Sequence, residues 1–446
     1  MGLSFTLNHG VTALSAAIKE QGHEVSLLHL ETFDLREVTD EIIGIDPDVI
    51  GISLTENHSR PMMELSEAIK QKKEKLIFWG GAFPSAYPAV IENFDHVDGI
   101  CLGEGERSFL QVLENIEKGK NFYNTRGFWF RDKNTVIKNE NFPIISDLDD
   151  LPFPDYSIFS ERAVYNCPAF SFSRGCPFKC TYCCSPLYVK RDMANKRIRH
   201  KSPQRAIMEI KQFLEKYDPP AISINDDTFL KSRKWAFEFL EIYQKEIKKP
   251  FRCNSRPETI KDDILKKMKE AGCEQIMMGI ESGDEEVRNR VLGRGMKNST
   301  IVEAFALVKK YGIRAPSFNM VGFPGDSPKS FKKTIELNQK LKPDNAQITI
   351  FYPYRGTFLG DKAYEEALVV GESHYSYVNK SILSLPGFST KQIERAAMLF
   401  KFRLYLPLDF RRGFLYLMSG ILVNYPKLYK IGKKIKTPLK KYVKWI

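Results

Sequence analysis

Short apolar runs alternate with amphipathic segments along most of the chain, a pattern that predicts strands alternating with helices. In the first part of the chain, the runs at 48–53, 75–79 and 99–102 are largely continuous, as expected of parallel strands buried on both faces. The segment 61–72, between the first two runs, has the spacing of a helix. The pattern predicts an α/β fold with a doubly wound, Rossmann-like or flavodoxin-like sheet in residues 1–120.

The beginning of the chain departs from that scheme. A helix is expected at residues 11–22, closed by Gly22, and a strand at 24–29. A doubly wound fold ordinarily opens on an apolar strand and a loop, and residues 3–7 are too few to supply both. The expectation is a first domain that lacks its first strand, and the alternative is that the true start of the chain lies upstream.

The second half of the chain repeats one unit, in which an apolar run ends in polar residues and an amphipathic helix follows. The runs are residues 169–173, 221–225, 251–255, 275–280, 316–322 and 346–351. Six such units predict a partial, TIM-like (β/α)6 barrel in residues 166–385. Barrels of this kind place their chemistry at the carboxyl ends of the strands, where the polar residues of this chain gather.

Two further segments flank the barrel. Residues 121–165 form a linker with a hairpin whose turn falls at 132–134. Residues 386–446 are expected to be a helical, basic C-terminal extension, in which 391–406 is amphipathic. The apolar run at 413–423 has only 11 residues, well short of the roughly 20 that cross a bilayer.

The net charge of +12 is concentrated in this extension. After Asp409 the sequence contains no acid, whereas Arg411, Arg412 and eight lysines contribute +10. The rest of the chain is therefore near neutral, which argues against nucleic acid as a partner. Aromatic residues among the lysines suit peripheral contact with an anionic membrane surface. The alternative is a helix that covers the open side of the barrel and ends in a solvated basic segment.

The number and spacing of the cysteines indicate the cellular compartment in which the protein is expected. Eight cysteines without a regular framework, and no secretory signal, argue against a disulfide-stapled secreted protein. The expected location is the cytoplasm, with peripheral attachment at the inner face of the membrane if the basic extension binds lipid.

Three cysteines in one short loop point to specific chemistry. Cys176, Cys180 and Cys183 have the spacing C-x-x-x-C-x-x-C, and three clustered thiolates suit a [4Fe–4S] cluster with one iron left open. Zinc is the competing metal, but zinc sites usually take four ligands from two paired hooks. Cys184 is interpreted as a packed or spare thiol, because neighbouring residues seldom reach one metal together.

With the aromatic Tyr182 directly before the third cysteine, this motif resembles that of the radical S-adenosylmethionine (radical SAM) superfamily. The resemblance implies that the open iron binds the amino and carboxylate groups of S-adenosylmethionine. It also implies that an electron donor such as flavodoxin or ferredoxin reduces the cluster, which releases a 5′-deoxyadenosyl radical that removes hydrogen from the substrate.

Polar residues at the strand ends are candidates for binding S-adenosylmethionine. By resemblance to the family, Asp226 and Asp227 would receive the amine, although a helix cap is the alternative for either one. Arg256 is a candidate clamp for the carboxylate or, alternatively, part of a surface ion pair. Glu281 and Ser282 match the family element Gly-Ile-Glu-Ser-Gly and would contact cofactor hydroxyls or the amine; an exposed glutamate before a helix is the alternative.

The first domain resembles the cobalamin-binding domain that precedes many radical SAM domains, over residues of about 7 to 115. The resemblance implies that cobalamin lies at the strand ends, near Ser53, Gly80, Gly81, Gly103 and Glu104. The Asp-x-His-x-x-Gly pattern that offers a histidine to cobalt is missing. A degenerate scaffold without cofactor is therefore the alternative, and His58 is interpreted as a solvated loop histidine.

The two resemblances together imply an enzyme that methylates an unactivated carbon of a small molecule or lipid. One alternative is radical oxidation, cyclisation or rearrangement on the same scaffold. Another is a non-enzymatic cobalamin- or redox-sensing iron–sulfur protein, which the polar residues Asp226, Arg256 and Glu281 speak against. No segment of the sequence is a dedicated substrate motif, so the substrate stays open.

Overall fold

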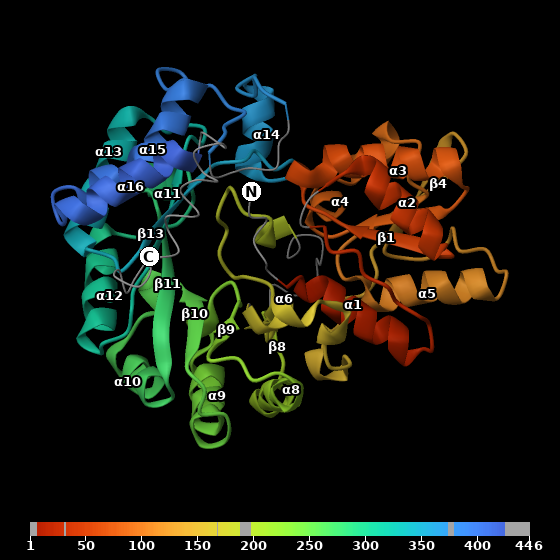
Figure 1. Cartoon of the computed structure of the whole chain (residues 1–446), viewed down its shortest axis with the longest axis horizontal. Coiled ribbons are helices and arrows are strands. Elements are labelled where there is room, and N and C mark those ends of the chain that lie inside the picture. Colours follow the sequence, from red (N-terminus) through yellow and green to blue (C-terminus); the bar gives the residue numbers. More distant parts are fainter. Residues whose placement is uncertain (1–6, 31–32, 167, 188–197, 373–378, 424–446) are drawn as a thin grey trace.

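The computed structural model describes residues 7–30, 33–166, 168–187, 198–372 and 379–423 of the 446 in the chain. Two α/β domains lie side by side (Figure 1): the first, in red and orange, occupies the right of the view, and the second, in green and blue, the left. Helices α15 and α16 lie on the outer side of the second domain.

The first domain contains a five-stranded sheet in the order β1-β2-β3-β4-β5. Its strands are β1 (Val49–Ser53), β2 (Leu76–Gly80), β3 (Gly99–Cys101), β4 (Phe128–Asp132) and β5 (Thr135–Lys138). Strands β1 to β3 are parallel, whereas β4 and β5 form an antiparallel hairpin on the edge of β3. The hairpin turns at Lys133, whose φ of 53° is left-handed. The hairpin expected in the linker therefore extends the first sheet.

Helices cover both faces of this sheet. They are α1 (His9–Glu20), α2 (Leu35–Ile45), α3 (Ser59–Lys72), the short α4 (Ala82–Ala86) and α5 (Gly105–Glu117). Trp79 and its face of the sheet pack with Ile42 of α2 and Leu65 of α3, whereas Phe78 packs on the other face with Ile18 of α1 and with α5. Alternate residues of one buried strand thus serve two cores, which confirms the predicted doubly wound fold.

The strand predicted at 24–29 is wrong. Residues 23–30 form no strand, and the first strand among the described residues is β1. The apolar residues in this segment pack into three different cores: Val25 on one face of the first sheet, Leu28 on the other, and Leu27 against the second domain. The alternation therefore reflects a partly buried segment whose apolar side chains contact several cores, without strand pairing in the described residues.

The second domain is built on a six-stranded parallel sheet in the order β13-β12-β11-β10-β9-β6. Its strands are β6 (Ala169–Phe170), β9 (Ile222–Ile224), β10 (Phe251–Ser255), β11 (Cys273–Glu281), β12 (Ser317–Val321) and β13 (Ala346–Ile350). Strand neighbours follow chain order, as in a TIM-like barrel that stays open, and this confirms the predicted partial (β/α)6 arrangement.

Helices connect these strands on the outer side (Figure 1). They are α8 (Pro203–Lys216), α9 (Arg233–Glu246), α10 (Asp262–Glu270), α11 (Glu285–Arg290), α12 (Asn298–Lys310), α13 (Pro328–Leu341) and α14 (Phe358–Glu365). Helix α8 begins at Pro203, because Ser202 accepts a hydrogen bond from the Arg205 N–H and Pro203 takes the first turn.

The C-terminal extension begins with α15 (Thr390–Tyr405) and α16 (Phe410–Val423). Helix α15 matches the amphipathic helix predicted at 391–406, and Ile393, Phe400 and Leu404 bury its apolar face against the second domain. Among the residues that the structure describes, no helix is long and apolar enough to cross a membrane. The lysine-rich segment after Val423 lies outside the described residues.

Candidate active site

A cavity of about 3190 Å³ lies between the two domains, at the carboxyl ends of both sets of parallel strands. Ser53 and Gly103 line it from the first domain, and Tyr182, Asp227 and Glu281 from the second. Both predicted sites therefore open into one space, as parallel sheets place their ligands beyond the carboxyl ends of the strands.

The cysteine loop follows the short strand β7 (Ser173–Arg174), which pairs with β8 (Arg199–His200). Cys180 is buried, whereas Cys176 and Cys183 are half-buried. The loop begins at Gly175, whose φ of 87° is accessible to glycine and whose carbonyl accepts a hydrogen bond from Lys231 Nζ at 2.6 Å. These contacts fix the direction in which the chain leaves the sheet.

The far side of the loop is held by the segment after α11. Thr181 donates its hydroxyl to the Val291 carbonyl at 2.6 Å and its N–H to the Leu292 carbonyl at 3.2 Å. A Cβ on Gly293 would lie 3.1 Å from the Lys179 carbonyl, so this approach is close enough to favour glycine. The loop is therefore anchored at both ends before any metal binds.

The donor set fits an iron–sulfur cube. No three His, Cys, Asp or Glu side chains in the described part of the chain converge on one metal ion. A [4Fe–4S] cube instead offers each thiolate a different iron, so its ligands need to surround a larger volume. Burial raises the pKa of Cys183 to about 11, and cluster binding would therefore release protons from these thiols.

Cys184 adjoins the loop but has a different environment. Burial raises the pKa of its thiol to about 12, with the neighbouring Cys183 and Glu56 acting in the same direction. The side chain is therefore a neutral, half-buried thiol. This environment agrees with the interpretation of Cys184 as a packed thiol.

The two aspartates after β9 face opposite ways. Asp226 is buried, and its Oδ1 accepts the N–H groups of Phe172 and Ser173 at 2.9 and 2.8 Å. Asp227 is exposed, lines the cavity and accepts a hydrogen bond from Ser185 Oγ at 2.9 Å. Of the pair, Asp227 is thus placed to meet a cofactor amine, whereas Asp226 holds the strand that leads into the cysteine loop.

Glu281 ends β11 in a strained conformation. Its φ of 63° is rare for a residue with a side chain, and the pairing of β11 with β12 shifts register beside it. The carboxylate lines the cavity and lies 3.3 Å from Arg294 Nη1. Burial raises the pKa of Glu281, although Arg294 and Arg256 oppose that rise. The strain aims a buried acid at the cavity, which suits a binding residue.

Sequence reasoning missed Arg294. Its side chain is buried; Nη1 donates to the Tyr182 hydroxyl at 2.8 Å, and Nη2 donates to the Gly279 carbonyl at 2.8 Å. It thereby links the aromatic residue of the cysteine motif to Glu281. The available signal was an arginine between two glycines, Gly293 and Gly295, which indicates a tight loop but no specific partner.

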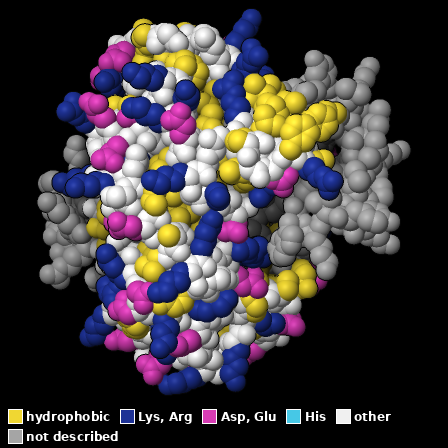
Figure 2. Space-filling view, turned by 90° about the vertical axis from the view of Figure 1, so that its left-hand side faces the viewer, with side chains coloured by type: hydrophobic (Ala, Val, Ile, Leu, Met, Phe, Trp, Pro, Cys, Tyr) yellow, Lys and Arg dark blue, Asp and Glu magenta, His cyan; other side chains and the backbone are white. Residues whose placement is uncertain are grey.

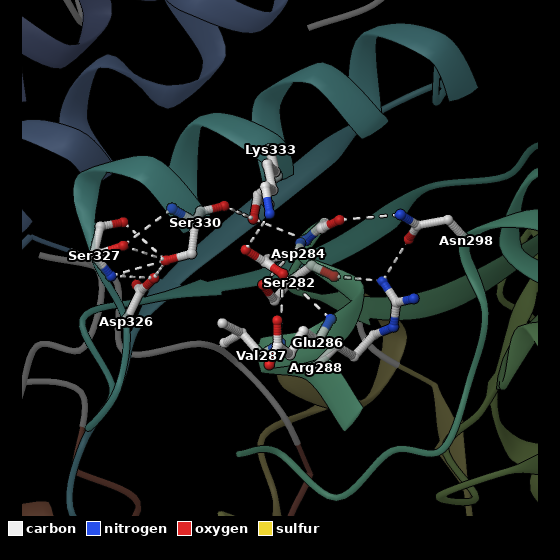
Figure 3. A network of polar contacts seen from close by, with 12 residues as sticks. Ser282, Asp284, Glu286, Val287, Arg288, Asn298, Asp326, Ser327, Ser330 and Lys333 are labelled. Carbon is white, nitrogen blue, oxygen red and sulfur yellow. Dashed lines mark hydrogen bonds and ion pairs between the residues drawn. The ribbon is translucent and has the colours of Figure 1, made fainter. Parts of the chain in front are cut away.

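Arg288 stabilises the loop that carries Arg294 through contacts with backbone groups on either side of that loop (Figure 3). Arg288 is fully buried, and its Nη1 donates to the Ser282 carbonyl and to Asn298 Oδ1, both at 2.8 Å. Its Nε and Nη2 donate to the Met296 carbonyl. Ser282, predicted to contact the cofactor, is itself buried, and its hydroxyl accepts the N–H of Asp284.

A second buried acid organises the turn after β12. Asp326 Oδ2 accepts the Gly322 N–H at 2.8 Å, and its Oδ1 accepts the Ser327 N–H at 2.8 Å and the Ser330 hydroxyl (Figure 3). Burial raises the pKa of Asp326 to about 6 despite these donors. A Cβ on Gly322 would lie 2.5 Å from Ile393, so the turn is tightly packed on α15.

Arg256 lies beside the cysteine loop. Its side chain is buried, with Nη1 3.3 Å from the Cys180 sulfur, Nε 2.6 Å from Glu258 Oε1 and Nη2 2.9 Å from the Arg294 carbonyl. All three guanidinium nitrogens therefore have partners within the chain. The sequence-based assignment of a carboxylate clamp stays a prediction.

The predicted cobalamin residues all line the cavity: Ser53, Gly80, Gly81, Gly103 and Glu104. Gly81 has a φ of 90°, and a Cβ there would lie about 3 Å from Ser53 Oγ, so the edge is closely packed. A Cβ on Gly103 would meet no atom within 4 Å, which leaves open space on the cavity side. This edge fits a large planar cofactor.

Glu104 and His58, which lie at or near this edge, interact with other side chains of the protein. Glu104 Oε1 lies 3.0 Å from Arg174 and 2.7 Å from Arg199, so its carboxylate joins the two domains. His58 is half-buried, and its Nδ1 lies 2.9 Å from Thr55 Oγ1. His58 is therefore less solvated than the sequence suggested, and its burial lowers the pKa of the imidazole.

Family comparisons agree with this layout. The sequence model of the radical SAM superfamily matches residues 170–337, and that of the B12 binding domain matches residues 4–113. The chain is a radical SAM enzyme with a B12-binding domain. Its cofactors are a [4Fe–4S] cluster, S-adenosylmethionine and cobalamin.

This radical SAM enzyme is similar to proteins of several organisms. An uncharacterized methyltransferase of Pyrococcus horikoshii is 27% identical over 397 residues, which cover 86% of this chain and 85% of the relative. An anaerobic magnesium-protoporphyrin IX monomethyl ester cyclase of a Synechocystis species is 23% identical, and the match covers 82% of this chain and 75% of the cyclase.

The radical SAM methyltransferase TsrM of Kitasatospora setae, solved with cobalamin and a [4Fe–4S] cluster bound, shares the fold of the enzyme. It superposes with a TM-score of 0.66 at 15% identity, over 88% of this chain and 79% of TsrM. At this identity the likeness concerns the arrangement of the domains.

Proposed function

We propose that this radical SAM enzyme transfers a methyl group to an unactivated carbon of a small molecule or lipid. The observation that carries the proposal is the shared cavity, because the strand ends of the B12-binding domain and the cysteine loop face the same space. When bound, the cofactors supply the methyl group and the radical that removes hydrogen, while the protein positions them and excludes water.

The residues of this chain take the following parts in the proposal. Cys176, Cys180 and Cys183 bind three corners of the cluster. Asp227, which lines the cavity and has an exposed carboxylate, receives the amine of S-adenosylmethionine. Glu281 accepts hydrogen bonds from cofactor hydroxyls and is held toward the cavity by Arg294.

Product analysis of the full chain tests the proposal. The anaerobic protein is loaded with iron, sulfide and cobalamin and then supplied with S-adenosylmethionine. Reduced flavodoxin or ferredoxin, which we infer to be the electron donors, is compared with a chemical reductant. Formation of both 5′-deoxyadenosine and S-adenosylhomocysteine supports methylation, and Cys183→Ala as the control should form no 5′-deoxyadenosine. Absence of both products would overturn the enzymatic assignment.

Cyclisation without net methylation is the second candidate, because a relative that matches 82% of the chain is named a cyclase. It predicts 5′-deoxyadenosine without S-adenosylhomocysteine in the same assay. The two candidates therefore differ in one product.

We further propose peripheral contact with an anionic membrane through α16. Figure 2 views the side that carries α13, α15 and α16 and shows hydrophobic side chains gathered in its upper part. On α16, Phe410 is 70% exposed, Phe414 50% and Met418 42%, next to Arg411 and Arg412. An exposed apolar stripe beside cations is typical of helices that lie on anionic lipid.

Vesicle sedimentation tests this contact at physiological salt. The full chain should bind vesicles that contain phosphatidylserine and ignore purely zwitterionic vesicles. The double variant Phe410→Ser/Phe414→Ser should lose most of that binding, whereas Phe358→Ser, at a site that is 69% exposed on α14, should keep it. Equal binding by both variants would contradict the role of α16.

A further inference from the structure

The three cysteines of the cluster loop receive different hydrogen bonds. Cys176 is approached by the backbone N–H of Phe178, and Cys183 by that of Ser185 at 3.4 Å. Cys180 is approached by the guanidinium of Arg256, with Nη1 3.3 Å from its sulfur. Lys231 and Asp227 act on Cys176 only through their charges, so among these hydrogen bonds only the one to Cys180 comes from a charged donor.

The position of Arg256 is fixed from several sides. Only 6% of the residue is exposed, and it does not line the cavity in which Asp227 and Glu281 lie. The ring centroid of Phe178 lies 3.7 Å from its guanidinium carbon, and the Arg294 carbonyl accepts from Nη2 at 2.9 Å. The contact with Cys180 is thus part of a rigid arrangement and does not depend on a mobile surface side chain.

Glu258 moderates the charge without cancelling it. Its Oε1 accepts from Arg256 Nε at 2.6 Å, on the edge of the guanidinium away from Nη1. The Glu258 side chain is 30% exposed and that of Arg256 is 7% exposed, but Glu258 Oε2 is itself buried. The ion pair therefore offsets part of the positive charge, and the Nη1 group keeps its donor proton directed at the Cys180 sulfur.

We propose that Arg256 is a positioning residue that sets the reduction potential of the iron–sulfur cluster through the sulfur of Cys180. Reduction adds one negative charge to the cluster. A buried cation and an N–H···S hydrogen bond stabilise the reduced form more than the oxidised form, and they therefore make the potential less negative. This role is an alternative to the carboxylate clamp predicted from the sequence. It needs the cluster and holds whichever reaction the enzyme performs.

A redox titration of the cluster-loaded full chain, followed by electron paramagnetic resonance without S-adenosylmethionine, tests the proposal. Arg256→Met should shift the potential to a more negative value. Arg256→Lys should shift it less, because the ammonium keeps the charge but loses the planar fork. Arg290→Met is the matched control, since that arginine is 80% exposed on α11, and its potential should equal that of the wild type.

Iron content and binding of S-adenosylmethionine are measured on the same samples. Wild-type potential in an iron-replete Arg256→Met protein would overturn the proposal, and loss of S-adenosylmethionine binding at that unchanged potential would restore the carboxylate clamp. If Arg256→Met does not bind iron, the reduction potential of Arg256→Lys tests the proposal instead. A negative shift in the lysine variant supports the proposal, and an unchanged potential refutes it.

Discussion

Arg174 forms an ion pair with Glu106 across the boundary between the B12-binding domain and the radical SAM domain. Arg174 lies two residues before Cys176, and Glu106 follows the strand end that lines the cobalamin side of the cavity. Glu104 joins the same cluster through Arg174 and Arg199. Burial disfavours the charged form of Glu104, but Arg199 and Arg174 outweigh it and hold its pKa below the ordinary value. The ion pairs therefore fix the cluster loop relative to the cobalamin edge.

Glu106→Gln should loosen this junction. The Glu106 side chain is 5% exposed. The substitution therefore leaves the positive charge of Arg174 without part of its neutralising negative charge at a largely buried site. We expect the free energy of unfolding of the full chain to fall by about 2 kcal/mol. Urea denaturation measures this change, and limited proteolysis of the linker should become faster.

The control for this substitution is Glu114→Gln on the same helix. Glu114 pairs with Lys118 at the surface, where both side chains are more than half exposed, so the free energy of unfolding should stay close to that of the wild type. Equal effects of the two substitutions would show that the ion pair at the domain boundary contributes no more to the free energy of unfolding than a surface ion pair does.

The three cysteines of the motif should each be required for iron. Replacing any one of Cys176, Cys180 or Cys183 with alanine removes a corner ligand, and we expect most of the iron and the thiolate-to-iron absorption to be lost. Cys184→Ala is the matched control, because that thiol is adjacent and half-buried, and it should keep the full iron load. Iron loss in the control would make Cys184 a ligand.

The sequence predicted the six strands of the second domain, but not the separate pair of β7 and β8. The six apolar runs correspond to the six parallel strands, because each run places buried apolar residues in the core of the domain and is bounded by glycine, proline or charged residues. The failure at 24–29 has a physical cause. Leu27 and its neighbours alternate because they contact separate cores, and single-chain periodicity cannot distinguish that from a paired strand.

The candidate site was predictable only in part. Local spacing was enough to find Cys176, Cys180 and Cys183, since all three lie in one loop. Arg294 and Arg174 were missed because their partners are far away in sequence: Tyr182 lies 112 positions from Arg294, and Glu106 lies 68 positions from Arg174. The first contact depends on the tertiary fold of the second domain and the second on how the two domains pack, and no local pattern encodes either.

Substitutions of Asp226 and Asp227 should distinguish a role in the stability of the fold from a role in cofactor binding. Asp226→Ala removes the acceptor of two buried N–H groups, and we expect it to lower the free energy of unfolding by about 1–3 kcal/mol. Asp227→Ala leaves the fold intact, because its carboxylate is exposed, but should weaken binding of S-adenosylmethionine about tenfold or more. Urea denaturation and anaerobic calorimetry measure the two effects.

Asp226→Asn refines that comparison. The amide oxygen can still accept the N–H groups of Phe172 and Ser173, so this variant should be more stable than Asp226→Ala. If Asp226→Asn instead abolished binding of S-adenosylmethionine at normal stability, the buried carboxylate would have to be the cofactor ligand.

Glu56 provides a prediction about pH. It lies in the 3-10 helix Glu56–His58 of the B12-binding domain and accepts the Arg355 N–H at 2.5 Å and the Tyr364 hydroxyl at 3.3 Å from the radical SAM domain. Burial raises its pKa from an ordinary value near 4.5 to about 7, and the contacts with Arg355 and Tyr364 only reduce that rise. The acid therefore sits protonated at the domain boundary in mildly acidic solution.

The sign of the effect follows from proton binding. Between pH 4.5 and 7 the folded chain holds a proton on Glu56 that the unfolded chain has released, so this group makes stability fall as the pH rises. The contribution is complete below pH 4.5 and lost above pH 7. Glu56→Gln keeps the neutral shape and should be more stable than the wild type at pH 8, by an amount on the order of 2–3 kcal/mol.

Urea midpoints measured at pH 5.5, 7 and 8 check this expectation. The wild-type and Glu56→Gln curves should converge toward acidic pH and separate as the pH rises. Glu64→Gln on α3 serves as the control, because that side chain is 50% exposed and its curve should follow the wild type. Parallel curves for Glu56→Gln and the wild type would mean that Glu56 is ionised in the folded chain, with Arg355 compensating its charge.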